Sequence, residues 1–157
     1  MDGLHQTGGS PAANVYEVHG TVIRHVCIKG RHRADWLTDE MIRDLHAPYP
    51  KCRAEGCNSF LRPDAVLFGE NLPANIWGKA DDATAGLRTG DVFMVIGTSG
   101  KVQPAASLPH MAASKGARII ECNTDGPNLA DLQKDLVFVK GPSAQTLPAI
   151  VAAVKAL

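Results

Sequence analysis

Two kinds of residue in this 157-residue chain could do chemistry: a histidine that precedes a glycine, and a set of closely placed cysteines. The histidine is His19, which follows the apolar, β-prone run at residues 15–18 and precedes Gly20. Because imidazole titrates near neutral pH, His19 is a candidate general base. A single histidine before a glycine is more often a partly exposed turn residue, so its role depends on the residues around it.

The cysteines predict a metal site. Cys52 and Cys57 form a Cys-x4-Cys pair, and Cys27 lies upstream of them. A tetrahedral zinc site would need a second pair, but where a Cys-x2-Cys spacing would place the partner of Cys27 the chain has Gly30. An open three-ligand site and three ordinary buried thiols without metal are the alternatives to a complete site. Three residues are candidates for the fourth ligand: His25, His32 and Asp35.

Composition limits the classes of partner. Sixteen basic and sixteen acidic residues leave no net charge, so the chain has no electrostatic footprint for nucleic acid or for an anionic membrane. It also lacks a bilayer-spanning apolar stretch and a signal-peptide pattern. We therefore expect a cytoplasmic protein without direct nucleic-acid or membrane partners, in which four cysteines serve as metal ligands or free thiols rather than disulfides.

Short apolar runs alternate with longer helix-like stretches in the second half of the chain. Buried parallel strands are predicted at residues 65–68, 91–96, 117–122 and 136–139, and helical segments at residues 72–87, 104–115 and 129–134. Upstream, residues 15–18 predict a short strand, and residues 36–45 predict a short helix that Thr38 could cap. The alternation predicts an α/β fold with a doubly wound, partial Rossmann-like parallel sheet. The less apolar, basic stretch from residue 24 indicates an insertion, and Cys122 is expected in the core of its strand.

Small hydrogen-bonding residues follow three of the predicted strands, where parallel sheets bind their ligands. Glycine lets a backbone approach a ligand closely, while hydroxyl, amide and carboxylate groups can reach ribose hydroxyls or ring nitrogens. The residues at any one strand end are those of an ordinary turn, but three such ends at one edge of the sheet favour a ligand site. The residues concerned are Gly97, Thr98, Ser99, Asn123, Thr124, Asp125 and Ser143.

Four ordered motifs resemble those of the sirtuins, a family of NAD-dependent protein lysine deacylases. They are Glu-Val-His-Gly at residues 17–20, the cysteine pair running into Leu-Arg-Pro-Asp at 61–64, Phe-Gly-Glu-Asn-Leu-Pro at 68–73, and Gly-Thr-Ser at 97–99 followed by Val-Gln-Pro-Ala-Ala at 102–106. Asn-Thr-Asp at 123–125 and Gly-Pro-Ser at 141–143 extend the similarity. Each motif is weak by itself, but their order and spacing are specific. The resemblance covers nearly the whole chain and only the second half of the family's domain.

The resemblance implies a mechanism and a set of site residues. In sirtuins the acyl-lysine oxygen attacks the anomeric carbon of the nicotinamide ribose, nicotinamide leaves, and the acyl group passes to ADP-ribose. A histidine acts as the general base that deprotonates a ribose hydroxyl, and His19 matches that histidine. The substrate peptide would pair as an added strand with Val66, Leu67, Phe68, Gly69 and Glu70. NAD would contact Asp2, Gly97, Thr98, Ser99, Asn123, Thr124, Asp125 and Ser143, and zinc would be held by Cys27, Cys52 and Cys57.

The resemblance further implies a catalytic domain that lacks its N-terminal part. Residues 24–62 would be a small zinc-knuckle-like insertion, and residues 1–23 and 63–157 the Rossmann-like part. The family's glycine-rich pyrophosphate loop, and the glutamine and asparagine that precede the residue matching Asp2, have no counterpart here. Losing two hydrogen bonds to a charged ligand would weaken NAD binding by roughly 3 to 6 kcal/mol, and we expect marginal stability for the chain alone. The alternatives are a non-catalytic sirtuin remnant that retains NAD, peptide or zinc binding, and a zinc-knuckle interaction module.

Overall fold

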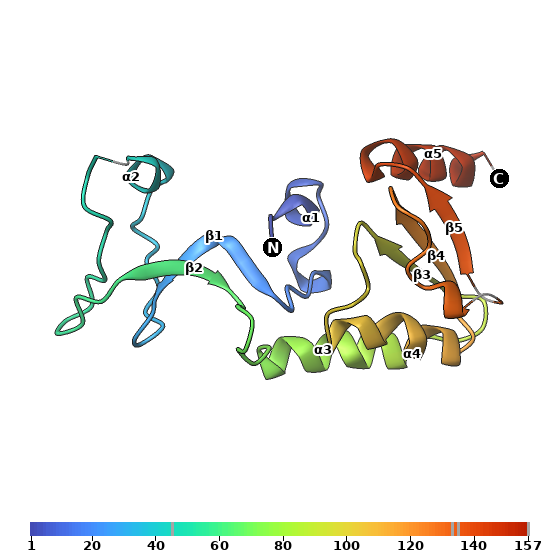
Figure 1. Cartoon of the computed structure of the whole chain (residues 1–157), viewed down its shortest axis with the longest axis horizontal. Coiled ribbons are helices and arrows are strands. Elements are labelled where there is room, and N and C mark those ends of the chain that lie inside the picture. The colour runs from blue at the N-terminus through green and yellow to red at the C-terminus, as the bar shows by residue number, and fades with distance from the viewer. Residues whose placement is uncertain (45, 133, 135, 157) are drawn as a thin grey trace. The chain divides into compact units, whose positions relative to one another are not determined.

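The computed structural model describes residues 1–44, 46–132, 134 and 136–156. The chain forms two compact units, Met1–Ala80 and Asp81–Leu157, whose elements are labelled in Figure 1. Helix α3 (Ala74–Ala85) contains the boundary between them. Among the residues that the structure describes, none of the helices combines the length and the apolar character needed to cross a membrane.

The first unit is built on an antiparallel pair of strands. Strand β1 (Gly20–Cys27) pairs with β2 (Leu61–Ala65), with an irregularity of register between Thr21 and His25. Helix α1 (Leu4–Thr7) and the 3-10 helix η1 (Ala12–Asn14) precede β1, and α2 (Asp39–Arg43) lies in the long connection between the strands. Figure 1 shows the two strands side by side, with this connection beyond one end of the pair.

The buried core of the first unit is small and contains two of the cysteines. Cys27, Ala34, Cys52 and Leu61 form it, and Trp36 is among the partly buried residues packed against it. The predicted cap of the short helix is confirmed, because the Thr38 hydroxyl accepts a hydrogen bond from the Met41 N–H at 3.3 Å. Of the predicted range 36–45, residue 45 lies outside the described residues.

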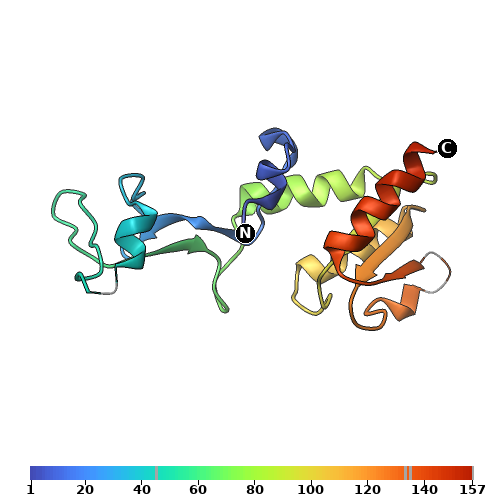
Figure 2. The same ribbon diagram turned by 90° about the horizontal axis from the view of Figure 1, so that it is seen from above.

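The second unit is a three-stranded parallel sheet with the order β3-β4-β5. Its strands are β3 (Val92–Ile96), β4 (Arg118–Asn123) and β5 (Leu136–Lys140). Its helical elements are η2 (Ala105–Ser107), α4 (Leu108–Ser114), η3 (Ala130–Leu132) and α5 (Ser143–Lys155). Figures 1 and 2 show α4 and α5 on opposite faces of this sheet. This arrangement confirms the predicted α/β class with a doubly wound parallel sheet.

A compact apolar cluster holds the second unit together. It consists of Val95, Ala112, Ala117, Ile119 and Leu129, with partly buried side chains such as Phe93 around it. Cys122 is 1% exposed, as expected for a core cysteine. The prediction that every strand is buried on both faces is wrong for β3. Every second residue of this strand, Val92, Met94 and Ile96, is exposed. Their strand is the first in the sheet order and pairs on one side with β4.

Two predicted strands are wrong. Residues 15–18 contain no strand; they follow η1 and lead through a turn into β1. Residues 65–68 are not a parallel strand, because β2 ends at Ala65, pairs antiparallel with β1, and is followed by a turn. Gly69 occupies the left-handed region at φ 87° in that turn, a conformation that interrupts an extended run.

Candidate functional site

His19 lies at the turn that leads into β1. The turn is closed by a hydrogen bond of 2.8 Å from the Gly20 N–H to the Glu17 carbonyl. Gly20 has φ 69°, and a Cβ on it would overlap with the carbonyl oxygen of Asp64, so only glycine fits this close approach of β1 to β2. The His19 carbonyl in turn accepts a hydrogen bond of 3.0 Å from the Val66 N–H. The histidine is therefore fixed beside the first residue of the predicted substrate segment.

The half-buried side chain of His19 opens into a pocket of the first unit. Asp2, predicted to contact the nicotinamide end of NAD, lines the same pocket, together with His5 and Glu17. The Leu4 N–H donates to the Asp2 carboxylate at 3.1 Å and holds the pKa of that carboxyl below its ordinary value. The pocket thus combines an imidazole with an ionised carboxylate. His5 is a pocket residue that the sequence interpretation missed, although it lies three positions from Asp2.

The predicted substrate segment forms an exposed turn directly after β2. The Glu70 N–H donates to the Leu67 carbonyl at 3.0 Å, and the Glu70 carboxylate accepts from the Leu67 N–H, also at 3.0 Å. The Phe68 side chain is 97% exposed. A turn with an outward aromatic side chain can receive a partner, but its backbone is not a strand in this structure.

Arg62 fixes this turn from within β2. Its Nη2 atom lies 2.7 and 2.9 Å from the two carboxylate oxygens of Glu70. The Arg62 guanidinium, and then the Leu67 N–H, hold the pKa of Glu70 below its ordinary value. Glu70, which was predicted to bind substrate, therefore has its carboxylate engaged within the protein and shapes the segment that would receive a peptide.

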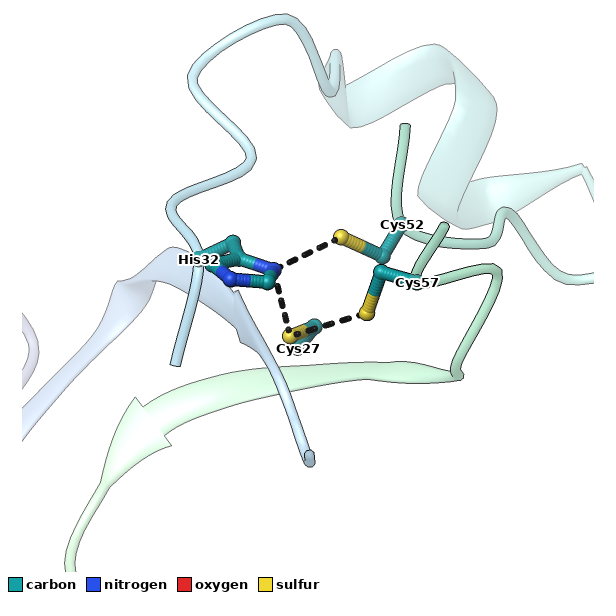
Figure 3. Close-up of side chains that lie close together, drawn as sticks. All are labelled: Cys27, His32, Cys52 and Cys57. Atoms are coloured by element: carbon teal, nitrogen blue, oxygen red, sulfur yellow. Dashed lines mark hydrogen bonds between the residues drawn. The ribbon is translucent and has the colours of Figure 1, made fainter. Parts of the chain in front are cut away.

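Four side chains converge at the far end of the β1–β2 pair (Figure 3). They are Cys27 at the end of β1, His32 in the turn that follows, and Cys52 and Cys57 before β2. One potential ligand atom from each lies within 4.8 Å of all the others. The structure thus brings the three predicted cysteines together, and of the three candidates for a fourth ligand it places His32 among them.

The spacing of these atoms fits a tetrahedral zinc ion. Bonds of about 2.3 Å to sulfur and about 2.0 Å to nitrogen place two sulfurs about 3.8 Å apart, and a sulfur and a nitrogen about 3.5 Å apart. The Sγ atoms of Cys27 and Cys57 are 3.8 Å apart. The Nδ1 atom of His32 lies 3.4 Å from the Cys27 Sγ and 3.5 Å from the Cys52 Sγ. A Cys3His set is also one of the ordinary structural zinc sites.

Hydrogen bonds around the cluster favour thiolates, the form that binds zinc. Burial raises the pKa of the Cys27 thiol, but hydrogen bonds from the Gly30 N–H and the Ser59 hydroxyl outweigh it and lower that pKa to about 5. The Ser59 hydroxyl, 3.3 Å from the Cys57 Sγ, also lowers the pKa of Cys57. Such contacts to the ligands orient them and tune the metal.

The pKa values of the other two members of the cluster, Cys52 and His32, are raised rather than lowered. At Cys52 the Ala54 N–H lowers the thiol pKa, but burial and the neighbouring thiols outweigh it and raise that pKa. The thiol of Cys57 and the negative charge at Cys27 raise the pKa of His32. The three sulfurs and the imidazole lie close enough to share protons. A bound divalent cation would displace those protons.

In the second unit, the predicted cofactor residues meet at the carboxyl ends of the strands. The Gly97 N–H donates to the Cys122 carbonyl at 2.9 Å, and the Asn123 amide donates to the Thr98 carbonyl at 2.8 Å. The Gly141 N–H donates to the Asn123 carbonyl at 2.9 Å, and Ser143 begins α5 just beyond it. The three strand ends thus form one hydrogen-bonded edge, as the sequence predicted.

A buried carboxylate that the prediction missed supports this edge. Glu121 in β4 is fully buried and accepts hydrogen bonds of 2.9 to 3.2 Å from the N–H groups of Asn128 and Leu129 and from the Asn128 amide. It anchors the loop that contains Thr124 and Asp125. The available signal was an acidic residue inside an apolar run, because a buried charge needs partners.

Comparison with known proteins identifies the family of the chain. The Sir2 family profile matches residues 1–104. The chain is 37% identical over 155 residues to NAD-dependent protein deacylase 2 of Pyrobaculum aerophilum, covering 99% of this chain and 57% of that protein. It is 40% identical over 152 residues to the NAD-dependent protein deacylase of Ralstonia nicotianae, covering 97% of this chain and 56% of that protein.

Solved structures show the same fold. A Sir2 homolog in complex with NAD superposes with a TM-score of 0.80 at 34% identity, covering 98% of this chain and 55% of the other. Sir2Af2 bound to a myristoylated histone peptide gives a TM-score of 0.79 at 33% identity, covering 99% of this chain and 62% of the other. The chain thus spans little more than half the length of the relatives it matches. With ordered motifs, profile and fold in agreement, the chain belongs to the Sir2 family.

Proposed function

We propose that the protein acts as an NAD-dependent protein lysine deacylase, or as the part of one that presents the general base and the acyl-lysine substrate. The observation that carries this proposal is the placement of His19 in one pocket with Asp2, while its own backbone is hydrogen-bonded to Val66. A base that must act next to a bound peptide needs this proximity, since proton transfer requires hydrogen-bond reach.

The roles of the chain's own residues follow from that geometry. NAD supplies the ribose that accepts the acyl group and the nicotinamide that leaves. His19 would remove the proton from a ribose hydroxyl, and the carboxylate of Asp2 would orient the nicotinamide end. The turn at residues 66–70, fixed by Arg62, would receive the peptide backbone by strand addition. This mode gives affinity with little sequence preference, which suits an enzyme that acts on acylated lysines in different proteins.

The second unit would bind the adenosine part of NAD. Gly97 has φ 60°, and no described atom lies within 4 Å of the position that a Cβ would take, which leaves its backbone open to a ligand. Thr98, Ser99, Asn123, Thr124, Asp125 and Ser143 are the polar residues proposed for this part. Together with the placement of Asn123 across two strand ends, they support a ribose and adenine site.

The domain organisation and compartment belong to the same proposal. Residues 24–62 would form a metal-binding insertion in a Rossmann-like domain made of residues 1–23 and 63–157. Cys27, Cys52, Cys57 and Cys122 are free thiols, which supports a reducing compartment such as the cytoplasm.

Nicotinamide release from NAD in the presence of an acyl-lysine peptide tests the proposal. Acetyl-, succinyl- and myristoyl-lysine versions of one peptide separate acyl preference from peptide preference. We expect release that falls by about 100-fold or more in His19→Ala, the range for loss of a general base, while peptide binding measured by fluorescence anisotropy stays within twofold. His46→Ala, an exposed histidine outside the pocket, is the matched control and should keep full activity. Binding of NAD and peptide without nicotinamide release, for all three acyl groups, would overturn the deacylase and identify a non-catalytic binding protein.

A further inference from the structure

We propose that His32 replaces residue 30 as the fourth ligand of the metal site, and that Gly30 is required because a side chain there would occupy the space of the His32 ring. The inference concerns the metal site alone and does not depend on deacylase activity. It assigns a Cys3His site, in which two neighbouring positions work as a pair.

A tight turn brings His32 back to Cys27. The Cys27 N–H donates to the His32 carbonyl at 2.9 Å, and the Arg31 N–H donates to the Cys27 carbonyl at 3.1 Å. Arg31 has φ 55°, in the left-handed region, and its guanidinium is paired with Asp64 of β2. The turn and the ion pair hold the segment that contains His32. The Nδ1 atom of His32 faces the Sγ atoms of Cys27 and Cys52 (Figure 3).

Gly30 lies against the metal-facing side of this turn. Its N–H donates to the Cys27 Sγ at 3.2 Å, so its backbone already takes part in the ligand environment. A Cβ on Gly30 would lie 2.7 Å from both the Cε1 and the Nε2 atoms of His32 and 3.3 Å from Nδ1. Real Cβ atoms do not approach ring atoms this closely, because 2.7 Å is well inside van der Waals contact. The His32 ring in its present place and a side chain at position 30 therefore exclude each other.

Backbone conformation does not explain this glycine. The glycines of the chain with positive φ do not include Gly30, so an alanine or cysteine would meet no backbone strain there. The constraint is the volume of the imidazole. Since a Cβ at position 30 would overlap with the Cε1 and Nε2 atoms of the ring, we infer that a cysteine at position 30 and a histidine at position 32 are alternative ways to complete the same site.

The other candidates for the fourth ligand do not belong to the cluster. The Asp35 carboxylate accepts two hydrogen bonds from Arg33, at 2.9 and 3.1 Å. His25 is buried within β1, and its carbonyl accepts from the Ala34 N–H. Within the described part of the chain, the cluster of potential metal ligands contains neither of them.

A histidine in place of a fourth cysteine changes the charge of the metal site. Four thiolates around Zn²⁺ carry two net negative charges, whereas three thiolates and a neutral imidazole carry one. His32 is also the exposed member of the cluster, whereas Cys27 and Cys52 are buried and Cys57 is half-buried. The electronic signature of the bound metal should therefore report which residue completes the site.

Cobalt substitution and zinc competition test the assignment on the full chain. Co²⁺ takes tetrahedral zinc sites, and its thiolate charge-transfer absorption increases with the number of thiolate ligands. We expect a three-thiolate spectrum for the wild type and one zinc per chain. His32→Ala should weaken zinc binding by at least about tenfold, as measured against a chromophoric chelator, given that even indirect contacts are worth about 10- to 100-fold. His46→Ala is the control and should retain wild-type affinity.

Two variants test the pairing of positions 30 and 32. Gly30→Ala adds only a methyl group and should also weaken zinc binding, because it displaces the His32 ring. The double variant Gly30→Cys/His32→Ala should recover the affinity lost in His32→Ala and give the stronger charge-transfer absorption of four thiolates. Wild-type affinity and an unchanged cobalt spectrum in His32→Ala would overturn the assignment. Full affinity in Gly30→Ala would overturn the exclusion between the two positions.

Misfolding of a variant does not remove the test. If His32→Ala fails to fold, ¹⁵N spectra of the wild-type imidazoles with and without zinc decide the matter. Metal binding at His32 should shift its Nδ1 resonance and leave that of His46 in place, and an unshifted His32 resonance in the zinc-loaded protein would contradict the assignment. None of these measurements uses NAD or an acylated peptide, so their failure and the failure of the proposed deacylase are separate results.

Discussion

The two units of this protein are stabilised in different ways. In the second, Ile119, Val95 and Leu129 join a contiguous apolar cluster between a parallel sheet and its helices. In the first, two of the four buried residues that form the core cluster are the potential metal ligands Cys27 and Cys52. Burial of apolar surface stabilises a fold whether or not a metal is present, whereas a ligand cluster does so only when the metal is bound. The difference predicts that the unit carrying His19 depends on metal and that the unit carrying the strand ends does not.

The largest expected effect is that of metal removal. Dialysis of the protein against a strong chelator should abolish hydrogen-exchange protection of the amides around the cluster, among them Cys27 and Cys52, because the metal bonds that join these side chains are lost. Amides of β3, β4 and β5 should keep their protection. Mass-spectrometric hydrogen exchange resolves the two regions, and added zinc should restore the first. Equal loss of protection in both units would show that the comparison is wrong.

The complementary change removes a core side chain from the second unit. Ile119 is completely buried in the apolar cluster, so Ile119→Ala should lower the free energy of unfolding by about 2 to 5 kcal/mol. Urea unfolding of the zinc-loaded protein measures this value, and hydrogen exchange should assign the loss to β3, β4 and β5. Val154→Ala removes apolar atoms from a side chain that is 63% exposed and should change stability by less than about 0.5 kcal/mol. A similar loss in both variants would argue against a packed core in this unit.

A smaller effect is expected at the buried carboxylate beneath the predicted nucleotide edge. Glu121→Gln keeps the shape of the side chain but turns one of two accepting oxygens into a donor, which then faces the N–H groups of Asn128 or Leu129. A mispaired buried donor costs about 1 to 3 kcal/mol. The loss should appear as faster exchange of the Asn128 and Leu129 amides, with the metal cluster unaffected. Asp131→Asn, a change at an exposed carboxylate in the adjoining 3-10 helix, should leave those two amides protected.

Sequence patterns predicted the second unit better than the first, and the reason is physical. The parallel strands β3 and β5 contain continuous apolar runs, and β4 is apolar apart from Glu121 and its two end residues, so each carries its own signal. Residues 66–68 are also apolar, yet they form a turn, since Gly69 adopts a left-handed conformation and the Glu70 carboxylate binds the Leu67 N–H. A local turn interaction of this kind overrides an apolar pattern only three residues long.

The site residues show the same division between local and distant information. The three cysteines were predicted as ligands from their spacing, and the structure brings them together. The sequence left three candidates for the fourth ligand, because the choice depends on the turn at Arg31 and on the empty space at Gly30. The partners of Glu121 lie seven and eight residues further on, so an acidic residue in an apolar run could be noticed but its role could not be predicted. Whether His19 and the strand-end residues act as proposed remains a prediction for the experiments above.

The smallest expected effect concerns Arg62 and Glu70, the pair that fixes the predicted substrate turn. Arg62 lowers the pKa of Glu70, so the folded protein holds the ionised carboxylate more strongly than the unfolded chain does. The stabilising contribution is therefore fully present above the ordinary glutamate pKa of about 4.3 and is lost as the pH falls through the lowered value. Because both side chains are partly exposed, at 17% and 41%, solvent screens the pair and the change in global stability should be slight.

The local effect of the Arg62–Glu70 pair is measurable. Arg62→Gln should return the Glu70 carboxyl titration, followed by NMR, toward its ordinary range and make the Leu67 amide exchange faster at neutral pH. Arg43→Gln, which removes a guanidinium 3.6 Å from Asp39 on an exposed helix, should leave both observables unchanged. If Leu67 exchange is equally slow in Arg62→Gln, the turn is held by its backbone alone, and Glu70 is then available to a bound peptide.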